Sequence, residues 1–414
     1  MANLLVDERD VKFVLYEQLD IEQLSNTAKY AEYSKEMYDL VLEQAWKLAE
    51  NEMAPANRKG DEQGCVWEDG RVRVPESYHR PYEMYRQGGW LSMAEALEAG
   101  GQGFPVVMGL AAIEAFGAAN LSLFLYPGLT HGAARLLEVY GTQEQQRTFM
   151  DKLYSGEWSG TMCLTEPQAG TDVGALRTKA IPNDDGTYSI IGTKIFISCG
   201  EHDLTENIVH MVLARIEGAP PGTKGISLFI IPKLRPENGE LVDNDVVCRG
   251  IEHKLGIHGS ATSTLNFGEN NNCIGYLLGE ANQGMRIMFQ MMNESRLFVG
   301  MQGQSHASAA YLYALHYSKE RTQGSDASRI KDPTAPRVAI INHPDVRRML
   351  MFMKSVSEGL RALLYYVGFC DDMVRSAEND QEREKYQDFI DILIPVCKAY
   401  GSDMGFRVCE TAIQ

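Results

Sequence analysis

The residues best suited to hold a ligand begin in residues 161–173, which read TMCLTEPQAGTDV. A β-type run there meets a Pro-to-Gly turn, so Thr165 and Glu166 should lie where a strand opens into a loop. Gly170 frees the backbone of this loop, and Thr171 adds a hydroxyl beside exposed N–H groups. That combination suits a phosphate or the polar edge of a ring system.

A second segment, residues 190–199, reads IIGTKIFISC and alternates as a β-strand. Simple alternation places Phe196 and Ser198 on one face of this strand. An aromatic ring and a hydroxyl on one face could contact the flat side and a polar atom of the same ligand. Taken alone, each segment is typical of an ordinary turn or strand.

Together the segments resemble the flavin-binding pattern of the acyl-CoA dehydrogenase family, T-E-P-x-A-G-S/T-D followed by G-x-K-x-[WF]-I-[ST]. The resemblance implies FAD as cofactor, with Thr165 at the polar edge of the flavin and Thr171 near phosphate. It also implies that Phe196 packs on the ring and that Ser198 reaches the reactive ring nitrogen. The residues of this region expected at the cofactor are Cys163, Thr165, Gly170, Thr171, Phe196 and Ser198.

Length and composition favour a chain of several domains. At 414 residues the chain exceeds what one hydrophobic core usually holds. A net charge of −17 disfavours nucleic acid as a partner, because phosphate binding needs a basic surface. Eight scattered cysteines without a C-x-x-C pair indicate reduced thiols and a cytoplasmic location. The sequence shows no histidine pattern of a metal site, and we expect no apolar stretch near the ~20 residues of a membrane span.

The period of the apolar residues predicts three domains: a helical domain over 1–159, a β domain over 160–278 and helices over 279–414. Within the first, Pro55 should end a helix and residues 60–75 should form a charged loop. The middle pattern favours a small antiparallel barrel or sandwich. Its expected strands are residues 162–165, 176–181, 188–198, 208–216, 226–234, 246–255 and 262–267.

This helix–strand–helix order is similar to the architecture of the acyl-CoA dehydrogenases. The implied fold class is α+β, with an N-terminal helical domain, a middle antiparallel β-barrel and a C-terminal helical bundle. Residues 252–263, 279–300 and 317–324 resemble further family segments, although Gly324 stands where Phe is usual. The long loop at 325–342 and the run at 343–354 resemble the long subgroup related to 3-methylthiopropanoyl-CoA dehydrogenase.

On the substrate side, dehydrogenation of a thioester needs a base for the α proton and a flavin for the β hydride. The family's usual base is a Glu in a Y-E-G-T-type segment, which the resemblance places beyond Gln414. Other members keep a base at the position of Ser295. Glu294 lies one residue earlier, about 100° around the helix. It is a weak candidate, and a solvated or locally paired carboxylate is the competing interpretation.

The resemblance also implies contacts to CoA and between subunits. Asn293 and Arg296 match substrate-facing positions of the family, and Thr171 is expected near the substrate as well as the cofactor. Arg321 matches an arginine that reaches the flavin pyrophosphate of a neighbouring subunit. We therefore expect a homodimer or homotetramer.

The predicted function is flavin-dependent α,β-dehydrogenation of an acyl-CoA thioester, with electrons passed to an electron-transferring flavoprotein. Alternatives are an acyl-CoA oxidase, a non-catalytic flavin-binding protein of the same fold, and an inactive fragment. A chain stopping at Gln414 would lack the usual base and a second flavin-contacting stretch. For such a chain we expect marginal stability, weak flavin binding and no dehydrogenation.

Overall fold

A computed structural model describes residues 3–414, which form two compact units. The first unit comprises the chain up to Ala54, Phe104–Ala119 and Arg296–Gln414. The second comprises Pro55–Gly103 and Asn120–Ser295. Two long helices, α5 (Val106–Tyr140) and α8 (Gly284–Glu320), therefore contribute residues to both units.

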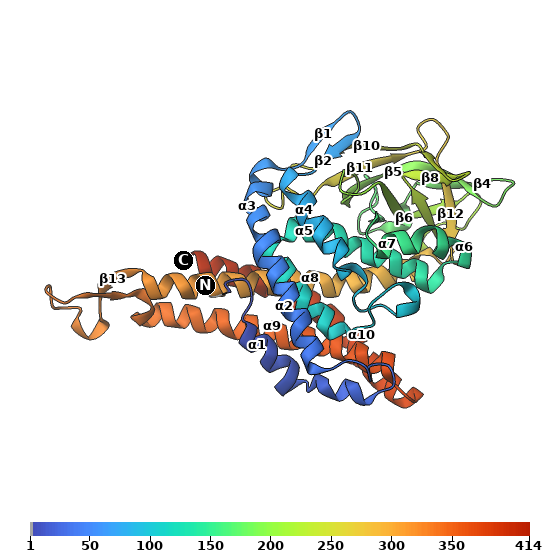
Figure 1. Ribbon diagram of the computed structural model, residues 1–414. Helices are drawn as coiled ribbons and strands as arrows, with labels where there is room; N and C mark the ends of the chain where they lie inside the picture. The colour runs from blue at the N-terminus through green and yellow to red at the C-terminus, as the bar shows by residue number, and fades with distance from the viewer. Residues whose placement is uncertain (1–2) are drawn as a thin grey trace. The chain divides into compact units, whose positions relative to one another are not determined.

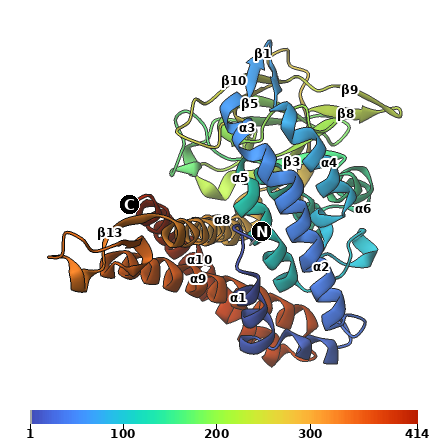
Figure 2. The ribbon, with the colours of Figure 1, turned by 60° about the vertical axis from the view of Figure 1, so that its left-hand side comes forward.

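The first unit is built mainly from long helices. Helices α9 (Pro344–Ser376) and α10 (Asp380–Ile413) are joined by three residues and run side by side in Figures 1 and 2. A Cβ added at Gly303 of α8 would collide with the backbone at Gly401 of α10, so glycine permits these two backbones to approach closely. The shorter helices of this unit are α1 (Glu8–Lys12) and α2 (Lys35–Leu48).

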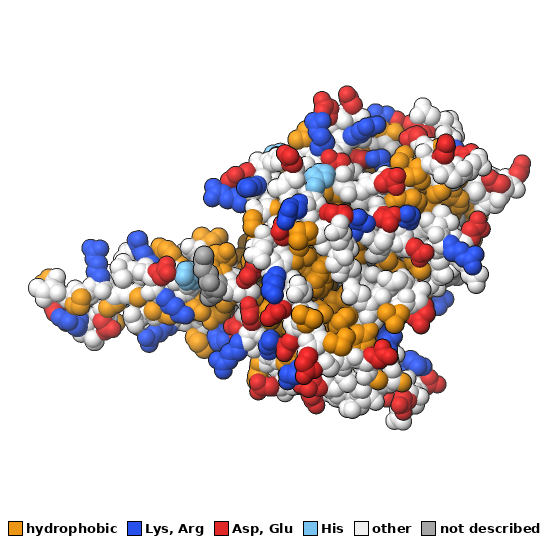
Figure 3. Space-filling view, in the orientation of Figure 1, with side chains coloured by type: hydrophobic (Ala, Val, Ile, Leu, Met, Phe, Trp, Pro, Cys, Tyr) orange, Lys and Arg blue, Asp and Glu red, His pale blue; other side chains and the backbone are white. Residues whose placement is uncertain are grey.

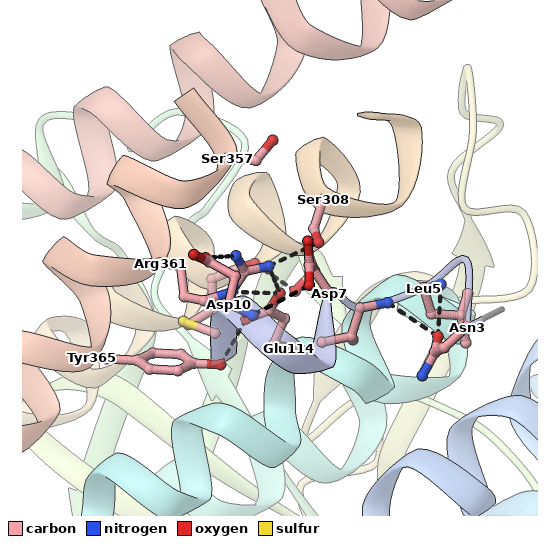
Figure 4. A network of polar contacts seen from close by, with 12 residues as sticks. Asn3, Leu5, Asp7, Asp10, Glu114, Ser308, Ser357, Arg361 and Tyr365 are labelled. Atoms are coloured by element: carbon pink, nitrogen blue, oxygen red, sulfur yellow. Dashed lines mark hydrogen bonds and ion pairs between the residues drawn. The ribbon is translucent and has the colours of Figure 1, made fainter. Parts of the chain in front are cut away.

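A buried arginine ties four helices of this unit together (Figure 4). Arg361 of α9, 1% exposed, donates through Nε to both carboxylate oxygens of Glu114 on α5, at 3.2 and 3.0 Å. It also donates to Ser308 Oγ of α8 at 3.0 Å and pairs with Asp10 of α1. Tyr365 donates to Glu114 Oε2 at 2.6 Å. Because a buried charge is costly unless it is paired, this network specifies how the four helices meet.

A buried carboxylate of α9, Asp372, caps the start of α5. Asp372 accepts hydrogen bonds from the backbone N–H of Val106 at 2.6 Å and of Val107 at 3.0 Å, and from Tyr30 Oη at 2.8 Å. The first N–H groups of a helix have no partner within the helix, so Asp372 supplies one. Burial raises the pKa of this carboxyl to about 7.

The second unit contains an eight-stranded sheet whose order is β10-β11-β5-β12-β7-β6-β3, with β4 paired to both β5 and β6. The double pairing of β4 closes the ring β5-β12-β7-β6-β4, which makes a small barrel. The strands are β3 (Trp158–Cys163), β4 (Lys179–Pro182), β5 (Tyr188–Ser198), β6 (Asn207–Ile216), β7 (Ile226–Pro232), β10 (Val246–Ile251), β11 (Thr262–Phe267) and β12 (Ile274–Leu278).

Strands β6 and β7 are buried on both faces, and their side chains alternate between two cores. Met211 and Leu228 belong to a core that includes Leu136 and other residues of α5. Val212 and Phe229, one position along each strand, belong to a separate core with other barrel residues. Because successive side chains of a strand point to opposite faces, a continuous apolar run in each strand contributes residues to both cores.

The observed strands differ from the sequence prediction in direction and number. Residues 188–198 and 262–267 coincide with β5 and β11, but β3 and β4 each run parallel to β6 rather than antiparallel. Apolar periodicity gives no information about strand direction, which the connections decide. The prediction also missed β12, and β9 (Glu240–Asp243), which pairs with β8 (Leu234–Glu237) in a hairpin.

The N-terminal region differs from the expected helices and charged loop. The segment that follows α2 continues through a π-helical turn, Ala49–Met53, into α3 (Ala54–Gln63). Pro55 therefore lies inside a continuous helical run, directly after the π-helical turn, and does not end the helix. The expected loop contains the hairpin β1 (Val66–Glu68) and β2 (Arg71–Arg73). The remaining helices here are α4 (His79–Gln87), α6 (Gln143–Gln145) and α7 (Asp151–Tyr154).

Helix α5 corrects the expectation about apolar length. By length and composition it is apolar enough to cross a membrane, and most of its most apolar stretch is buried inside the protein. Glu114 and Asn120 interrupt the apolar run in the sequence, which hid its overall hydropathy. Asn120 also breaks the helix, with φ −160° and ψ 86°. The apolar residues of α5 line protein cores.

Charged side chains of both signs are interspersed on the face shown in Figure 3. Exposed ion pairs elsewhere in the described chain include Lys35–Glu22 and Arg58–Glu62, each 2.8 Å apart. Such pairs contribute little to stability, because solvent screens them. The buried pairs described above are therefore the electrostatic contacts that matter for the fold.

Gln304 on α8 provides a test of packing in the first unit. Its side chain is completely buried, and neither amide atom has a hydrogen-bond partner within residues 3–414. Replacing a buried, unsatisfied polar group by an apolar one removes a desolvation cost. We predict that Gln304→Leu raises the free energy of unfolding by about 1–2 kcal/mol, measured by urea denaturation.

The matched control is Gln302→Leu, two residues away on the same helix and half-buried. This variant should leave the free energy of unfolding nearly unchanged. A loss of stability in Gln304→Leu but not in Gln302→Leu would mean that the Gln304 amide is hydrogen-bonded in solution.

Candidate functional site

The two ligand-type segments of the sequence meet at the ends of β3 and β5. The backbone N–H of Ile195 donates to the carbonyl of Thr165 at 2.9 Å. Cys163, the last residue of β3, is fully buried, whereas Thr165 is half-buried. Ser198, the last residue of β5, is also half-buried. Thr165 and Ser198 thus lie at the open ends of two associated strands.

Phe196 lies at a bulge in β5. Ile197 pairs with Ser263 and Lys194 pairs with Leu265, so two residues of β5 face only Thr264 of β11. Phe196 has a φ of 58°, in the left-handed region that bulky residues rarely adopt. Its side chain is 58% exposed. Bulges and strained residues occur at functional sites because they redirect a side chain, and here an aromatic ring is directed outward.

A buried ion pair holds these two segments together. Lys194 of β5 donates through Nζ to Glu166 Oε1 at 2.8 Å and to the carbonyl of Leu164 at 2.9 Å. Both charged side chains are at most 2% exposed. Glu166 also accepts hydrogen bonds from Gln168 Nε2, from the backbone N–H of Arg177 and Thr178, and from Thr178 Oγ1.

The ionised form of Glu166 is strongly favoured. Burial by itself would raise the pKa of this carboxyl, but the charge of Lys194 and the surrounding donors outweigh it. The pKa of Glu166 is therefore lowered to about 2. A carboxylate that accepts several N–H and O–H bonds beside a cation stays charged across the physiological range.

The loop after this pair has a different character. Gly170 and Thr171 are exposed. The backbone of Gly170 is outside the left-handed region, and an added Cβ would meet no atom of the described chain within 4 Å. Neither backbone conformation nor packing within the described chain therefore requires glycine at this position. The expectation that Gly170 is needed to free the loop backbone is not supported. What remains is an open surface beside a hydroxyl.

The residues expected from the sequence to face the substrate lie along α8. Asn293 and Arg296 are both half-buried. Ser295 donates to the carbonyl of Met291 at 2.8 Å. Glu294 accepts from Gln290 Nε2 at 3.2 Å and lies 3.7 Å from His131 Nδ1. Glu294 is thus a locally paired carboxylate, the interpretation that competed with a catalytic base.

Arg321 belongs to the first unit and is exposed. It follows α8, and its carbonyl accepts from the backbone N–H of Ile340 at 2.8 Å. Its Nη2 donates to Gln323 Oε1 at 3.0 Å. The expected long loop beyond it contains ordered pairing between β13 (Thr322–Ser325) and β14 (Arg337–Ala339), which corrects the sequence interpretation.

One charged cluster of the second unit was not found from the sequence. Its members, which we call the His131 cluster, are Glu95, His131, Arg135, Glu138, Tyr154 and Glu294. The spacing of His131, Arg135 and Glu138 shows that they share one face of α5. Glu95 and Glu294 come from distant parts of the chain, so only the folded structure brings them to that face.

Comparison with known proteins shows which family the chain resembles over its whole length. Models of the acyl-CoA dehydrogenase N-terminal, middle and C-terminal domains match residues 35–157, 161–269 and 282–414. The chain is 42% identical to a butyryl-CoA dehydrogenase of Syntrophomonas wolfei, over all of this chain and 69% of that protein. It is 41% identical to 3-methylmercaptopropionyl-CoA dehydrogenase of Ruegeria pomeroyi, over 98% of this chain and 68% of that one.

A solved acyl-CoA dehydrogenase from Bacillus anthracis, complexed with FAD, has the same fold. It superimposes with a TM-score of 0.73 at 22% identity, over 94% of this chain and 63% of that chain. The chain thus belongs to the acyl-CoA dehydrogenase family, a class of FAD-dependent oxidoreductases. The predicted family, fold class, enzyme class and cofactor are confirmed, and the methylmercaptopropionyl relative confirms the predicted subgroup.

Lys194 allows a direct test of the buried pair. Lys194→Met would leave the Glu166 carboxylate buried beside an apolar side chain. We predict a loss of about 3–5 kcal/mol in the free energy of unfolding, because an uncompensated buried charge is strongly destabilising. Lys179→Met, at an exposed position of β4, is the control and should change little. Equal effects of the two substitutions in a denaturant titration would contradict the importance of the pair.

Glu166 should also give the protein an acid-dependent stability. Its pKa falls from an ordinary 4.5 to about 2 on folding. The carboxylate therefore contributes its full stability above about pH 4.5, and this contribution is lost as the pH falls towards 2. We predict that Glu166→Gln flattens the stability profile over this window, while exposed Glu217→Gln does not. A wild-type-like slope in Glu166→Gln would rule out this carboxyl as the source.

Proposed function

We propose that the chain binds FAD at the ends of β3 and β5 and belongs to an enzyme that catalyses α,β-dehydrogenation of an acyl-CoA thioester. The observation that carries this proposal is the bulge that directs the exposed Phe196 ring outward, beside strands joined by the Ile195–Thr165 hydrogen bond. When bound, FAD supplies the acceptor for the β hydride. Phe196 would support the flat face of the flavin, and Thr165 and Ser198 would donate to its polar atoms.

We propose that the remaining contacts to FAD and CoA are made by the residues expected from the sequence. Thr171, on its open loop, is proposed to contact phosphate. Asn293 and Arg296 are proposed for the CoA thioester. Arg321, exposed after α8, is proposed for the flavin of a neighbouring subunit, in a homodimer or homotetramer. The proposed domains are residues 1–159, 160–278 and 279–414.

The proposed substrates are short acyl-CoA thioesters, because the relatives named above act on butyryl-CoA and 3-methylmercaptopropionyl-CoA. The proposed electron acceptor is an electron-transferring flavoprotein. All eight cysteines are free, which supports the proposed cytoplasmic location. Glu294 is not proposed as the base, because Gln290 donates a hydrogen bond to one of its oxygens and His131 Nδ1 lies 3.7 Å from the other.

Phe196 provides the test of the flavin site. Because its ring is 58% exposed, Phe196→Ala should leave the stability of the apoprotein nearly unchanged. Loss of the ring contact should weaken FAD binding by about three- to tenfold, measured by quenching of flavin fluorescence. Ile191→Ala, at an exposed position of the same strand, should bind FAD normally. Unchanged FAD affinity in Phe196→Ala would place the flavin elsewhere.

Ser198 provides a test of the reduction of bound flavin, separate from the test of flavin binding. Ser198→Ala should weaken reduction of bound flavin by butyryl-CoA more than it weakens the fold, since one hydrogen bond is worth only ~1 kcal/mol to stability. Stopped-flow absorbance of the flavin measures the reduction. A wild-type reduction rate would exclude this hydroxyl from the reaction.

Turnover by this chain also tests the role of Glu294. Glu294→Gln should retain whatever flavin reduction the wild-type chain shows with saturating butyryl-CoA, because the residue is paired within the protein. Complete loss of reduction in Glu294→Gln, with FAD and CoA affinities preserved, would identify Glu294 as the base.

A further inference from the structure

The His131 cluster joins the first half of α8 to α5 within the second unit. His131 Nε2 lies 2.9 Å from Glu95 Oε1, and its Nδ1 lies 3.7 Å from Glu294 Oε2. The imidazole thus stands between two carboxylates from distant parts of the chain. Glu95 is almost completely buried, whereas His131 and Glu294 are each about one-third exposed.

Further charged groups surround this imidazole. Arg135 Nη1 lies 3.3 Å from Glu95 Oε2 and 2.7 Å from Glu138 Oε2. Tyr154 of α7 donates to Glu138 Oε2 at 2.6 Å, and its ring centre is 6.1 Å from that of His131. The other oxygen of Glu294 accepts from Gln290, one turn earlier on α8.

The charge balance of the cluster favours a protonated His131. Its carboxylates are Glu95, Glu138 and Glu294, and Arg135 is its permanent cation. The Oε2 atom of Glu294 is buried and has no hydrogen-bond partner in the described chain, so a neutral imidazole would leave it without a compensating charge. A protonated imidazole supplies that charge to both Glu95 and Glu294.

The pKa of His131 agrees with this balance, whereas burial acts against ionisation of Glu294. Burial lowers the pKa of His131, but the hydrogen bond that the imidazole donates to Glu95 and the charges of Glu95 and Glu294 outweigh both burial and the opposing charge of Arg135. The pKa of His131 is therefore raised above its ordinary 6.5. Burial raises the pKa of Glu294, and the charge of His131 opposes that rise.

We propose that protonated His131 clamps Glu294 to α5 and thereby positions the turn of α8 that carries Asn293 for the CoA thioester. His131 and Glu294 are positioning residues in this proposal, and neither takes a proton from the substrate. The clamp itself rests on geometry within one unit. Its effect on ligand binding rests on the proposed function, in which Asn293 contacts CoA.

If the clamp exists, the stability of the ligand-free protein should depend on pH. A histidine whose pKa is raised by folding stabilises the protein fully below pH 6.5, and this contribution is lost as the pH rises through the folded pKa. The thermal midpoint of the wild-type chain should therefore fall between pH 6 and 9. In His131→Gln it should be lower at pH 6 and should change less over this range.

The control for this measurement is His316→Gln. His316 also faces a carboxylate on α8, Glu320 at 3.4 Å, but both side chains are exposed. Its removal should leave the wild-type pH profile in place. If His131→Gln keeps the wild-type slope, or if His316→Gln loses it, the clamp is excluded.

Binding of butyryl-CoA tests the positioning role. By calorimetry, wild-type affinity should weaken roughly tenfold between pH 6.5 and 9, as one proton is lost from the clamp. His131→Gln and Glu294→Gln should each bind weakly at both pH values. Because the two residues act as one unit, the double variant should bind no more weakly than either single variant.

The two experiments separate this inference from the proposed function. If the stability profile depends on His131 but wild-type protein binds no butyryl-CoA at any pH, the proposed function fails while the clamp stands. If wild-type protein binds butyryl-CoA and both single variants bind it equally well at each pH, the positioning role is overturned. Additive losses in the double variant would also overturn it, because independent effects would exclude a shared clamp.

Discussion

The buried contact between Lys194 and Glu166 is the constraint on which the proposed flavin site depends. Glu166 follows β3 and Lys194 lies in β5, so their pairing fixes the relation between the two strand ends that would hold FAD. The cost of burying both charges is offset because Glu166 accepts from several further donors. Removing Lys194 would leave the Glu166 carboxylate buried without a counter-charge, so this arrangement has few alternatives.

The first unit uses the same physical strategy in a helical setting. Arg361 and Glu114 form a buried pair whose remaining donors reach Asp10 and Ser308. Apolar helix faces can pack in several registers of similar energy, whereas a buried arginine is satisfied in very few. Both units therefore rely on apolar area for stability and on buried ion pairs for a unique arrangement.

Apolar periodicity predicted the long elements well and the short ones poorly. Strand β5 and the helices α8 and α9 carry enough repeats for their period to be clear, whereas α10 was expected only as part of a helical region. Strand β12 and the hairpin of β8 and β9 are too short for that, and the direction of β3 has no signature in its own residues. Pro55 was misread because the helix continues through it directly after a π-helical turn, which apolar periodicity does not reveal.

For the site, the sequence by itself determined the residue types, the spacing of the two segments and, through resemblance, the cofactor. Thr165, Phe196 and Ser198 could be named because their motif is local. The tertiary structure alone decided that a bulge turns Phe196 outward and that Glu294 faces His131 and Glu95 rather than standing alone. Residues far apart in sequence meet through packing and charge compensation, and a linear pattern carries no record of either.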